Sequence, residues 1–355
     1  MFITNNGIIK EISIDHFRGL RNLKVDNLSR INVFVGANNC GKTSILEALK
    51  IMSDPSNVGY LTSIAFHRAS ATAEQKLKNI VNYVLSTFRE HIDDKDRYYS
   101  IKMSVSTNAN TYYYDADATL GEQINYAGER RQTLDIAVGT STNGRKTTYT
   151  RERIVNNTNN VFEAKDNPLF RALYIQANAS LYRSSVLFLS EYIVREGKSD
   201  ILHILQSFDS NIEDISIIES DIYIHNAISG SMPLFTYGAG LQKAVLLTSV
   251  IVSCQNGIVL IDEIDNSIHV SAFKEVLSWF IDACVRYNVQ AFITTHSIEA
   301  LDAIINTSSK NTIENDILRV ITLRKDVRNS VTRVKLRTGQ EALEDRDIFK
   351  TELRV

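Results

Sequence analysis

The sequence has few residues that break or cross-link a polypeptide chain. Only 3 Pro and 15 Gly occur among its 355 residues, below the usual shares of about 5% and 7%. Long flexible linkers are therefore not expected, and each Gly cluster needs a specific explanation. The three cysteines, Cys40, Cys254 and Cys284, are odd in number and far apart, which excludes a disulfide framework and a CxxC-type zinc site. A reducing, cytoplasmic environment is expected.

Long hydrophobic runs and an excess of one charge are also absent. No stretch of 18 or more apolar residues occurs, and the N-terminus lacks the basic and apolar regions of a signal peptide, so neither membrane insertion nor secretion is expected. Lys and Arg number 39 against 41 Asp and Glu, a net charge of -2, which gives no global basic field for nucleic acid. With 44% hydrophobic and 23% charged residues, the chain is expected to fold as a globular protein.

The order of hydrophobic patterns predicts an α/β core interrupted by an insertion. Residues 11–25 alternate apolar and polar positions like edge strands, residues 31–35 form a continuous apolar run, and residues 44–52 have helical spacing. Residues 56–97 have a helical pattern, and residues 98–150 are rich in Tyr, Thr and Val with Asn-Gly turns, which predicts antiparallel strands. Buried strands and helices then alternate to the end. We predict a core of residues 1–54 and 184–355, with an inserted helical and antiparallel β region at 55–183.

A phosphate-binding loop lies between the first buried strand and the first helix. Residues 36–43, GANNCGKT, match G-x-x-x-x-G-K-[ST]. In this pattern the backbone N–H groups of small residues surround a phosphate at a helix N-terminus, Lys42 reaches the β- and γ-phosphates, and Thr43 ligates magnesium. The sequence predicts a P-loop NTPase, with nucleotide-binding residues Gly36, Asn38, Asn39, Cys40, Gly41, Lys42, Thr43 and Ser44.

Two later segments place polar side chains after buried strands. Asp262 and Glu263 follow the apolar run 258–261, and His296 follows the apolar segment 289–293 and two threonines. The carboxyl ends of strands in an open α/β sheet are where ligands bind. Asp262 would hold magnesium, and Glu263 would polarise an attacking water. A histidine at this edge could contact a γ-phosphate or the water, but from spacing alone a structural role is equally expected.

These motifs resemble those of ABC-type ATPases of the SMC, RecF and OLD (overcoming lysogenization defect) group, especially stand-alone bacterial OLD-like ATPases of the AAA family. ISIDHFRGLRNLKV is similar to the opening strand pair of that group, and GANNCGKTSILEAL is similar to its Walker A motif. IVLIDEIDNSIHVSA resembles the joined Walker B motif and D-loop, and FITTHSIEAL resembles the switch-histidine segment. Four motifs in the same order span both ends of the chain.

The resemblance implies a catalytic arrangement shared by two protomers. TYGAGLQKA takes the place of the ABC signature, where Gly238 and Gly240 would meet the γ-phosphate bound by the opposite subunit. ATP and Mg²⁺ are then the expected ligands, in a homodimer or larger homo-oligomer that hydrolyses ATP. The resemblance implies that Lys42, Glu263 and His296 of this chain are catalytic and that Thr43 and Asp262 hold the metal. Arg18 in the FRG string is a further candidate to approach the nucleotide.

The resemblance also implies a separate effector. Several OLD-like proteins carry a C-terminal Toprim nuclease domain, but only 59 residues, 355 minus 296, follow His296. A sensor or regulatory ATPase of a bacterial anti-phage defence system, acting with a nuclease or toxin encoded nearby, is therefore expected, with no membrane partner. The Q-loop glutamine stays open between Gln123 and Gln176.

The alternative is a RecF-like repair ATPase that binds DNA, for which two groups of basic residues are the evidence. A solvated charged face is the simpler explanation for such groups. An ABC transporter ATPase is disfavoured because no LSGGQ sequence occurs. The two basic groups are Arg319, Arg324, Lys325, Arg328, Arg333, Lys335 and Arg337, and Arg130, Arg131, Arg145, Lys146, Arg151 and Arg153.

Overall fold

The chain forms two compact units, each assembled from three segments. Unit 1 comprises Met1–Leu28, Asn38–Phe170 and Leu323–Lys335, and unit 2 comprises Ser29–Ala37, Arg171–Thr322 and Leu336–Val355. The division into a core of 1–54 and 184–355 stays a prediction, and its boundary at 183/184 lies outside the described residues. The computed structural model describes residues 8–68, 72–93, 96–126, 128–158, 160, 168–177, 189–190, 193, 198–219, 221–266, 268, 273–308, 316–326, 331–347 and 353.

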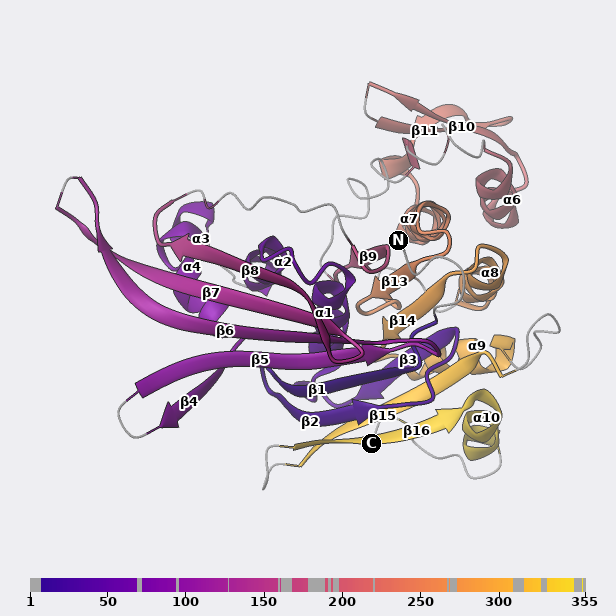
Figure 1. Ribbon diagram of the computed structural model, residues 1–355. Coiled ribbons are helices and arrows are strands. Elements are labelled where there is room, and N and C mark those ends of the chain that lie inside the picture. Colours follow the sequence, from indigo (N-terminus) through magenta and orange to yellow (C-terminus); the bar gives the residue numbers. More distant parts are fainter. Residues whose placement is uncertain are drawn as a thin grey trace. The chain divides into compact units, whose positions relative to one another are not determined.

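Unit 1 contains a seven-stranded sheet in the order β2-β1-β5-β6-β7-β8, with β4 paired to β5 (Figure 1). Neighbouring strands pair antiparallel throughout, as expected for strands joined by hairpins. The strands are β1 (Glu11–Phe17), β2 (Leu20–Val25), β4 (Arg89–Asp93), β5 (Asp96–Ser106), β6 (Thr111–Ile124), β7 (Arg130–Thr142) and β8 (Arg145–Val155).

Unit 1 has four helices among the described residues, two of which contact the sheet directly. They are α1 (Lys42–Ser53), α2 (Gly59–Arg68), α3 (Ala73–Lys78) and α4 (Ile80–Leu85). Helix α1 contacts β5, and α4 contacts β7 and β8. Alternate residues of the strands, such as Ile101, Ala116, Leu134 and Val138, are buried, because successive side chains of a strand point to opposite faces.

A six-stranded sheet in the order β16-β15-β3-β14-β13-β9 belongs to unit 2, except for residues 323–326 of β15 and 331–335 of β16, which belong to unit 1. The strands β3, β14, β13 and β9 pair parallel, and β3, β13 and β14 are buried at every residue, as is typical of parallel strands covered on both faces. Their bounds are β3 (Ile31–Gly36), β9 (Ala172–Ile175), β13 (Ile258–Ile261), β14 (Gln290–Thr294), β15 (Leu318–Asp326) and β16 (Val331–Thr338).

Helices and a small three-stranded sheet complete unit 2. Helix α8 packs on α7 and α9, and α6 packs on α7 and β10. The long apolar runs of α7 and α8 lie in one continuous hydrophobic core with β3, β13 and β14. The elements are α6 (Ser199–Phe208), β10 (Ile212–Ile218), β11 (Asp221–Asn226), β12 (Gly230–Pro233), the 3₁₀ helix η1 (Leu234–Thr236), α7 (Ala239–Ser253), α8 (Phe273–Arg286), α9 (Ile298–Ser308) and α10 (Gly339–Asp347).

The architecture confirms the predicted α/β class with an additional helical and antiparallel β region. Two local predictions were wrong. Strand β1 is not an edge strand, because β5, far along the chain, pairs with its open side. The antiparallel region begins at Arg89 rather than at residue 98, because β4 forms a hairpin with β5. The first error concerns a partner that is distant in the sequence, which a local pattern does not reveal. The second concerns where a local hairpin begins.

Candidate active site

The phosphate loop has a backbone that its glycines make possible. Gly36 ends β3 with φ 142°, Asn39 has φ 62°, and Gly41 precedes α1 with φ 106°. The φ of 106° favours glycine at this position, and a Cβ atom added there would lie 2.3 Å from Leu20 Cδ2, so the Leu20 side chain would have to shift. These positive φ angles curl the loop at the N-terminus of α1, where backbone N–H groups and the helix dipole favour an anion.

The side chains of the loop differ in exposure. Lys42 is 6% exposed, and its Nζ lies 3.9 Å from Cys40 Sγ. Asn38 and Asn39 are exposed, Thr43 is half-buried, and Cys40 and Ser44 are buried. The first turn of α1 contains no acidic residue, so its charge comes from the Lys42 ammonium and the helix terminus, which suits a phosphate group.

Helix α1 is tied to its unit by a buried carboxylate that the sequence analysis missed. Glu47 is 3% exposed, and its two oxygens lie 2.8 Å from Arg18 Nε and 2.8 Å from Arg68 Nε. Arg18 lies in the turn between β1 and β2 with φ 53°. Its backbone N–H donates a hydrogen bond of 2.9 Å to the backbone carbonyl oxygen of Thr87. A charged residue inside the apolar string SILEALKIM was the available signal.

In unit 2, the carboxyl ends of the parallel strands gather the other candidates at one edge. Phe34 of β3 pairs with Thr294 of β14, and Ile293 pairs with Ile261 of β13. The Thr295 N–H donates to Phe34 O at 3.4 Å, and the Asp262 N–H donates to Ile175 O of β9 at 2.9 Å. The start of the phosphate loop, the two carboxylates and His296 therefore follow neighbouring strands, as predicted from their spacing.

Thr294 holds both carboxylate residues. Its hydroxyl donates to Asp262 Oδ1 at 2.7 Å and accepts from the Glu263 N–H at 2.8 Å. The Ile264 N–H donates to Thr294 O at 3.0 Å. Asp262 is 7% exposed, and Glu263 adopts φ 51°, a left-handed conformation that is uncommon outside Gly and Asn. These hydrogen bonds fix the turn that presents Glu263, and the sequence analysis did not single out Thr294.

Glu263 and His296 lie beside each other. Glu263 Oε1 is 3.9 Å from His296 Nε2, and both side chains are 37% exposed. Asn266 Nδ2 donates to Glu263 Oε2 at 2.8 Å and to Ala177 O at 3.1 Å. The Thr295 hydroxyl donates to Asp265 Oδ1 at 2.5 Å. A partly exposed carboxylate oriented by an amide and adjacent to an imidazole can bind and polarise a water molecule.

The predicted signature segment forms a turn and a helix. Gly238 precedes α7, which begins at Ala239. Neither Gly238 nor Gly240 has a positive φ, and a Cβ added at either would meet no described atom within 4 Å. Folding of the chain therefore gives no reason for glycine at these two positions.

Two polar groups of the signature segment are buried. Lys243 is 3% exposed, and burial lowers its pKa to about 8, although the nearby carboxylates of Asp265 and Glu263 act to raise it. The Tyr237 hydroxyl is buried with no hydrogen-bond partner in the described part of the chain.

Of the two candidate Q-loop glutamines, only Gln176 lies in unit 2. It directly follows β9, whose last residue Ile175 pairs with Ile261, whereas Gln123 lies in β6 of unit 1. Within the described ranges, no group of three or more His, Cys, Asp and Glu residues could hold a metal ion. Among the described helices, none is both long and apolar enough to cross a membrane.

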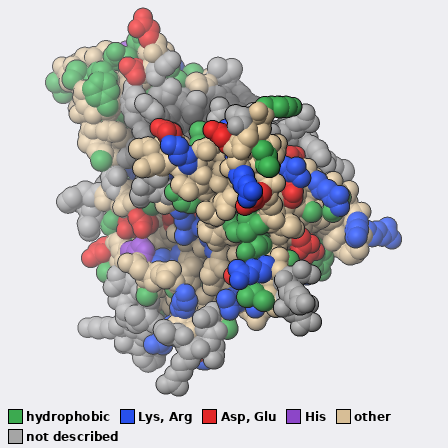
Figure 2. All heavy atoms as spheres, turned by 90° about the vertical axis from the view of Figure 1, so that its left-hand side faces the viewer, with side chains coloured by type: hydrophobic (Ala, Val, Ile, Leu, Met, Phe, Trp, Pro, Cys, Tyr) green, Lys and Arg blue, Asp and Glu red, His purple; other side chains and the backbone are tan. Residues whose placement is uncertain are grey.

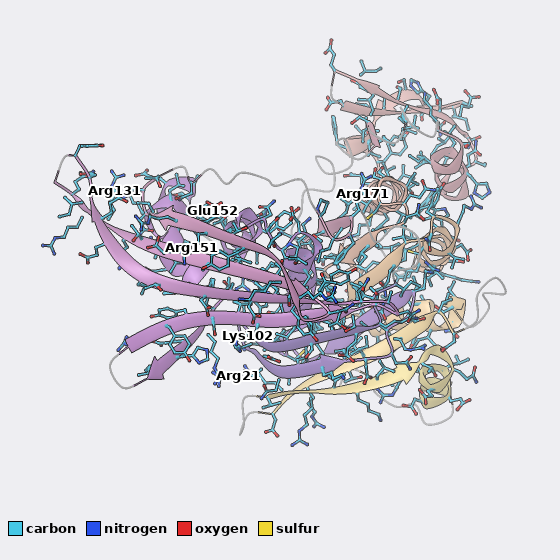
Figure 3. All side chains as sticks on the ribbon, in the orientation of Figure 1. Arg21, Lys102, Arg131, Arg151, Glu152 and Arg171 are labelled. Carbon is cyan, nitrogen blue, oxygen red and sulfur yellow. The ribbon has the colours of Figure 1, made fainter. Side chains whose placement is uncertain are left out.

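Many of the basic residues considered for DNA binding pair with acidic neighbours. Figure 2 shows Lys and Arg interspersed with Asp and Glu on one face, and Figure 3 shows Lys102, Arg131 and Arg151 at separate places along the antiparallel sheet. Arg328 lies outside the described residues. The closest nitrogen–oxygen distances are Arg319–Asp316 2.6 Å, Arg333–Asp326 2.8 Å, Arg337–Asp345 2.7 Å, Arg131–Glu129 3.2 Å and Arg153–Asp135 2.6 Å.

Comparison with known proteins agrees with this fold and site. A crystal structure of the SMC head bound to the C-winged helix domain of ScpA matches with a TM-score of 0.51 and 13% identity, covering 94% of this chain and 99% of the other. The Pyrococcus furiosus Smc head with an extended coiled coil, bound to the C-terminal domain of ScpA, gives 0.50 and 10%, covering 97% and 100%. The fold is that of an ABC-type ATPase head.

Sequence comparison identifies the family. The family model described as "AAA domain, putative AbiEii toxin, Type IV TA system" matches residues 31–302, more than half of the chain. An ATP/GTP phosphatase of Helicobacter pylori is 23% identical over 335 residues, covering 84% of this chain and 88% of the relative. The chain belongs to this AAA domain family and is an ATPase, with the fold of the SMC heads.

Proposed function

We propose that this ATPase hydrolyses ATP with Glu263 as the general base and His296 as its neighbour at the γ-phosphate. The observation that carries the assignment is the double hydrogen bond of the Thr294 hydroxyl, which fixes Asp262 and the Glu263 backbone in one turn. Rigid placement of a base and of charged groups is what phosphoryl transfer to water requires, because little covalent chemistry is needed.

The phosphate loop supports ATP as the substrate. The left-handed backbone at Gly41, where a Cβ would collide with Leu20, curls the chain around a space for a phosphate, and the buried Lys42 supplies a positive charge. Thr43 and Asp262 fit the oxygen donors that Mg²⁺ prefers. When bound, Mg²⁺ would neutralise charge on the phosphate oxygens. The protein's own contribution is to orient water at Glu263 and to place Lys42 near the β- and γ-phosphates.

We further propose that two protomers bind ATP between them through the signature segment. Glycine at Gly238 and Gly240 is not required by the fold of one chain, and close approach of a nucleotide phosphate to the backbone is a reason for it. Phe235, directly before this segment, is 57% exposed, and Ile228, in the turn between β11 and β12, is 80% exposed. Exposed apolar side chains beside a ligand-binding segment suit a protein interface.

The proposed biological role is that of a sensor or regulator in a bacterial anti-phage defence system. ATP-dependent assembly would control a separate effector, a nuclease or toxin encoded nearby. The family description, which refers to a toxin of a type IV toxin–antitoxin system, supports a two-component arrangement. The RecF-like alternative needs basic side chains that are free to bind the phosphates of DNA. The ion pairs described above reduce the positive charge available for such binding.

Native mass measured with and without ATP and Mg²⁺ tests this assembly. Glu263→Gln is expected to accumulate an ATP-bound dimer, and Lys42→Ala is expected to remain monomeric because it lacks the phosphate contact. Gly238→Arg, which adds a bulky side chain in open space, should leave the monomer folded and prevent the dimer. A Glu263→Gln protein that binds ATP but stays monomeric would refute the shared site.

Purification from the native host tests the partner. We expect the product of a neighbouring gene to copurify and to change its association when ATP is added. Recovery of DNA instead, with an affinity that falls steeply as salt rises, would favour the RecF-like alternative.

A further inference from the structure

Thr295, the residue directly before His296, has a buried hydroxyl with no role in the site described so far. The residue is 0% exposed. Its hydroxyl donates to Asp265 Oδ1 at 2.5 Å and accepts the Ser297 N–H at 3.1 Å. A short distance is typical of a hydroxyl that donates to a carboxylate, and such bonds are stronger than those between neutral groups. One side chain therefore joins the turn after β13 to the turn before α9.

The residues on both sides of His296 are fixed. On the N-terminal side, the Thr295 N–H donates to Phe34 O of β3 at 3.4 Å, in addition to the bonds of the hydroxyl. On the C-terminal side, Ser297 Oγ accepts the Ala300 N–H at 3.0 Å, which is the bond of an N-cap residue at the start of α9. The imidazole, 37% exposed, thus belongs to a short segment that is anchored to β3, to α9 and to the turn after β13.

Asp265 follows Glu263 by two residues in the same turn. The Asn266 N–H donates to Glu263 O at 2.9 Å, which closes the turn around Asp265. The Thr294 hydroxyl binds the first part of this turn, and the Thr295 hydroxyl binds its later part. The bond between Thr295 and Asp265 therefore fixes the histidine segment relative to the turn that presents the carboxylate of Glu263.

We propose that Thr295 and Asp265 are positioning residues that hold His296 beside Glu263 during ATP hydrolysis. This inference rests on the proposed function of His296 at the γ-phosphate. Without the bond between Thr295 and Asp265, the two turns lose a direct connection, and the imidazole is placed less accurately against the carboxylate, 3.9 Å away. The phosphate loop is unchanged, so ATP binds as before while the chemical step slows, because misplacement of a catalytic group lowers the rate.

Thr295→Val tests the hydroxyl, because valine has a similar shape and makes no side-chain hydrogen bond. We expect kcat to fall roughly tenfold or more while KM for ATP changes less than about twofold. Thr295→Ser keeps the hydroxyl and should keep kcat within about twofold of the wild type. Thr248→Val is the control and should keep both constants, because that threonine is also 0% exposed and its hydroxyl donates within its own helix. Wild-type kcat in Thr295→Val, or an equal loss in Thr295→Ser, would overturn the proposal.

A double-mutant cycle tests the pair. Asp265→Ala removes the acceptor from a partly exposed residue, so it also serves if Thr295→Val does not fold. If the two residues act through their mutual bond, Asp265→Ala should show the kcat loss of Thr295→Val, and the double variant should be no slower than either single variant. Asp265→Asn, whose amide oxygen can still accept the hydroxyl, should lose less than Asp265→Ala. Losses that multiply in the double variant would refute the proposal, because they show that the two residues act independently.

His296→Ala, assayed in parallel, distinguishes this inference from the proposed function. If His296→Ala hydrolyses ATP at the wild-type rate, the proposed function of His296 is wrong, whatever Thr295 does. If His296→Ala is slow and Thr295→Val matches Thr248→Val, the function of His296 stands and the positioning role of Thr295 and Asp265 is wrong.

Discussion

The hydroxyl of Thr294 donates a hydrogen bond of 2.7 Å to Asp262 Oδ1. Thr294 ends β14, and Asp262 directly follows the neighbouring parallel strand β13, so this bond joins the two strands at their carboxyl ends. The same hydroxyl also accepts the Glu263 N–H, so a single side chain orders both carboxylate residues. The arrangement makes Thr294 a positioning residue for the proposed reaction.

Thr294→Val should therefore lower activity more than stability. Valine keeps the shape but removes both hydrogen bonds, and a buried hydrogen bond to a charged group contributes roughly 1.5–3 kcal/mol. We expect kcat to fall by tenfold or more, measured as steady-state phosphate release. Thr248→Val is the control, because the hydroxyl of that buried threonine only donates to Ala244 O in its own helix. Equal activity of the two variants would contradict the positioning role.

Gly41→Ala should abolish nucleotide binding. Alanine is strained at φ 106°, and its Cβ would also displace the Leu20 side chain, whose Cδ2 would lie 2.3 Å away, so the phosphate-binding form of the loop is disfavoured. Binding of a fluorescent ATP analogue measures this loss. Gly19→Ala, at a position with no described atom within 4 Å of the added Cβ, should bind as the wild type does.

Glu47→Gln should destabilise the protein. It leaves the arginines at 2.8 Å without their carboxylate, and breaking a buried ion pair costs about 3–5 kcal/mol. Because Arg68 is 42% exposed at its side chain, we expect a loss near the lower end, about 3 kcal/mol, in urea unfolding. The exposed pair Lys78–Glu74 provides the control: Glu74→Gln should cost no more than about 0.5 kcal/mol.

Lys243→Met should stabilise the protein at neutral pH. The pKa of Lys243 is lowered from 10.5 to about 8, which corresponds to roughly 3 kcal/mol against the charged folded state. In the wild type this cost is complete below pH 8 and is relieved as the pH rises from about 8 to 10.5, because the unfolded chain then binds more protons. The free energy of unfolding should thus rise over that window in the wild type only. A variant less stable than the wild type at pH 7 would contradict this expectation.

The sequence predicted the parts of the site that local patterns encode. Continuous apolar runs marked β3, β13 and β14, and the polar residues after them were expected at one edge because parallel strands share a direction. Thr294 escaped notice because a threonine inside the strand-forming run AFITT has no distinguishing pattern. Its role depends on the register of β14 against β13.

Charges that act across the fold could not be predicted from spacing. Glu47 pairs with Arg18 and Arg68, which come from a hairpin turn and another helix. Lys243 and Asp265 are separated in the sequence by the rest of α7 and by β13, yet the carboxylate of Asp265 acts to raise the pKa of Lys243. Likewise β1 has the alternation of an edge strand, and only the distant β5 makes it an interior one.

The most direct test of the central claim is single-turnover hydrolysis of ATP by Glu263→Gln, with ATP binding measured on the same samples. The account predicts wild-type binding and a rate reduced roughly 100-fold or more, the usual contribution of a general base. Asn266→Ala, which removes the amide that orients Glu263, should show a smaller loss. Hydrolysis by Glu263→Gln at the wild-type rate would contradict the claim that this carboxylate activates the water.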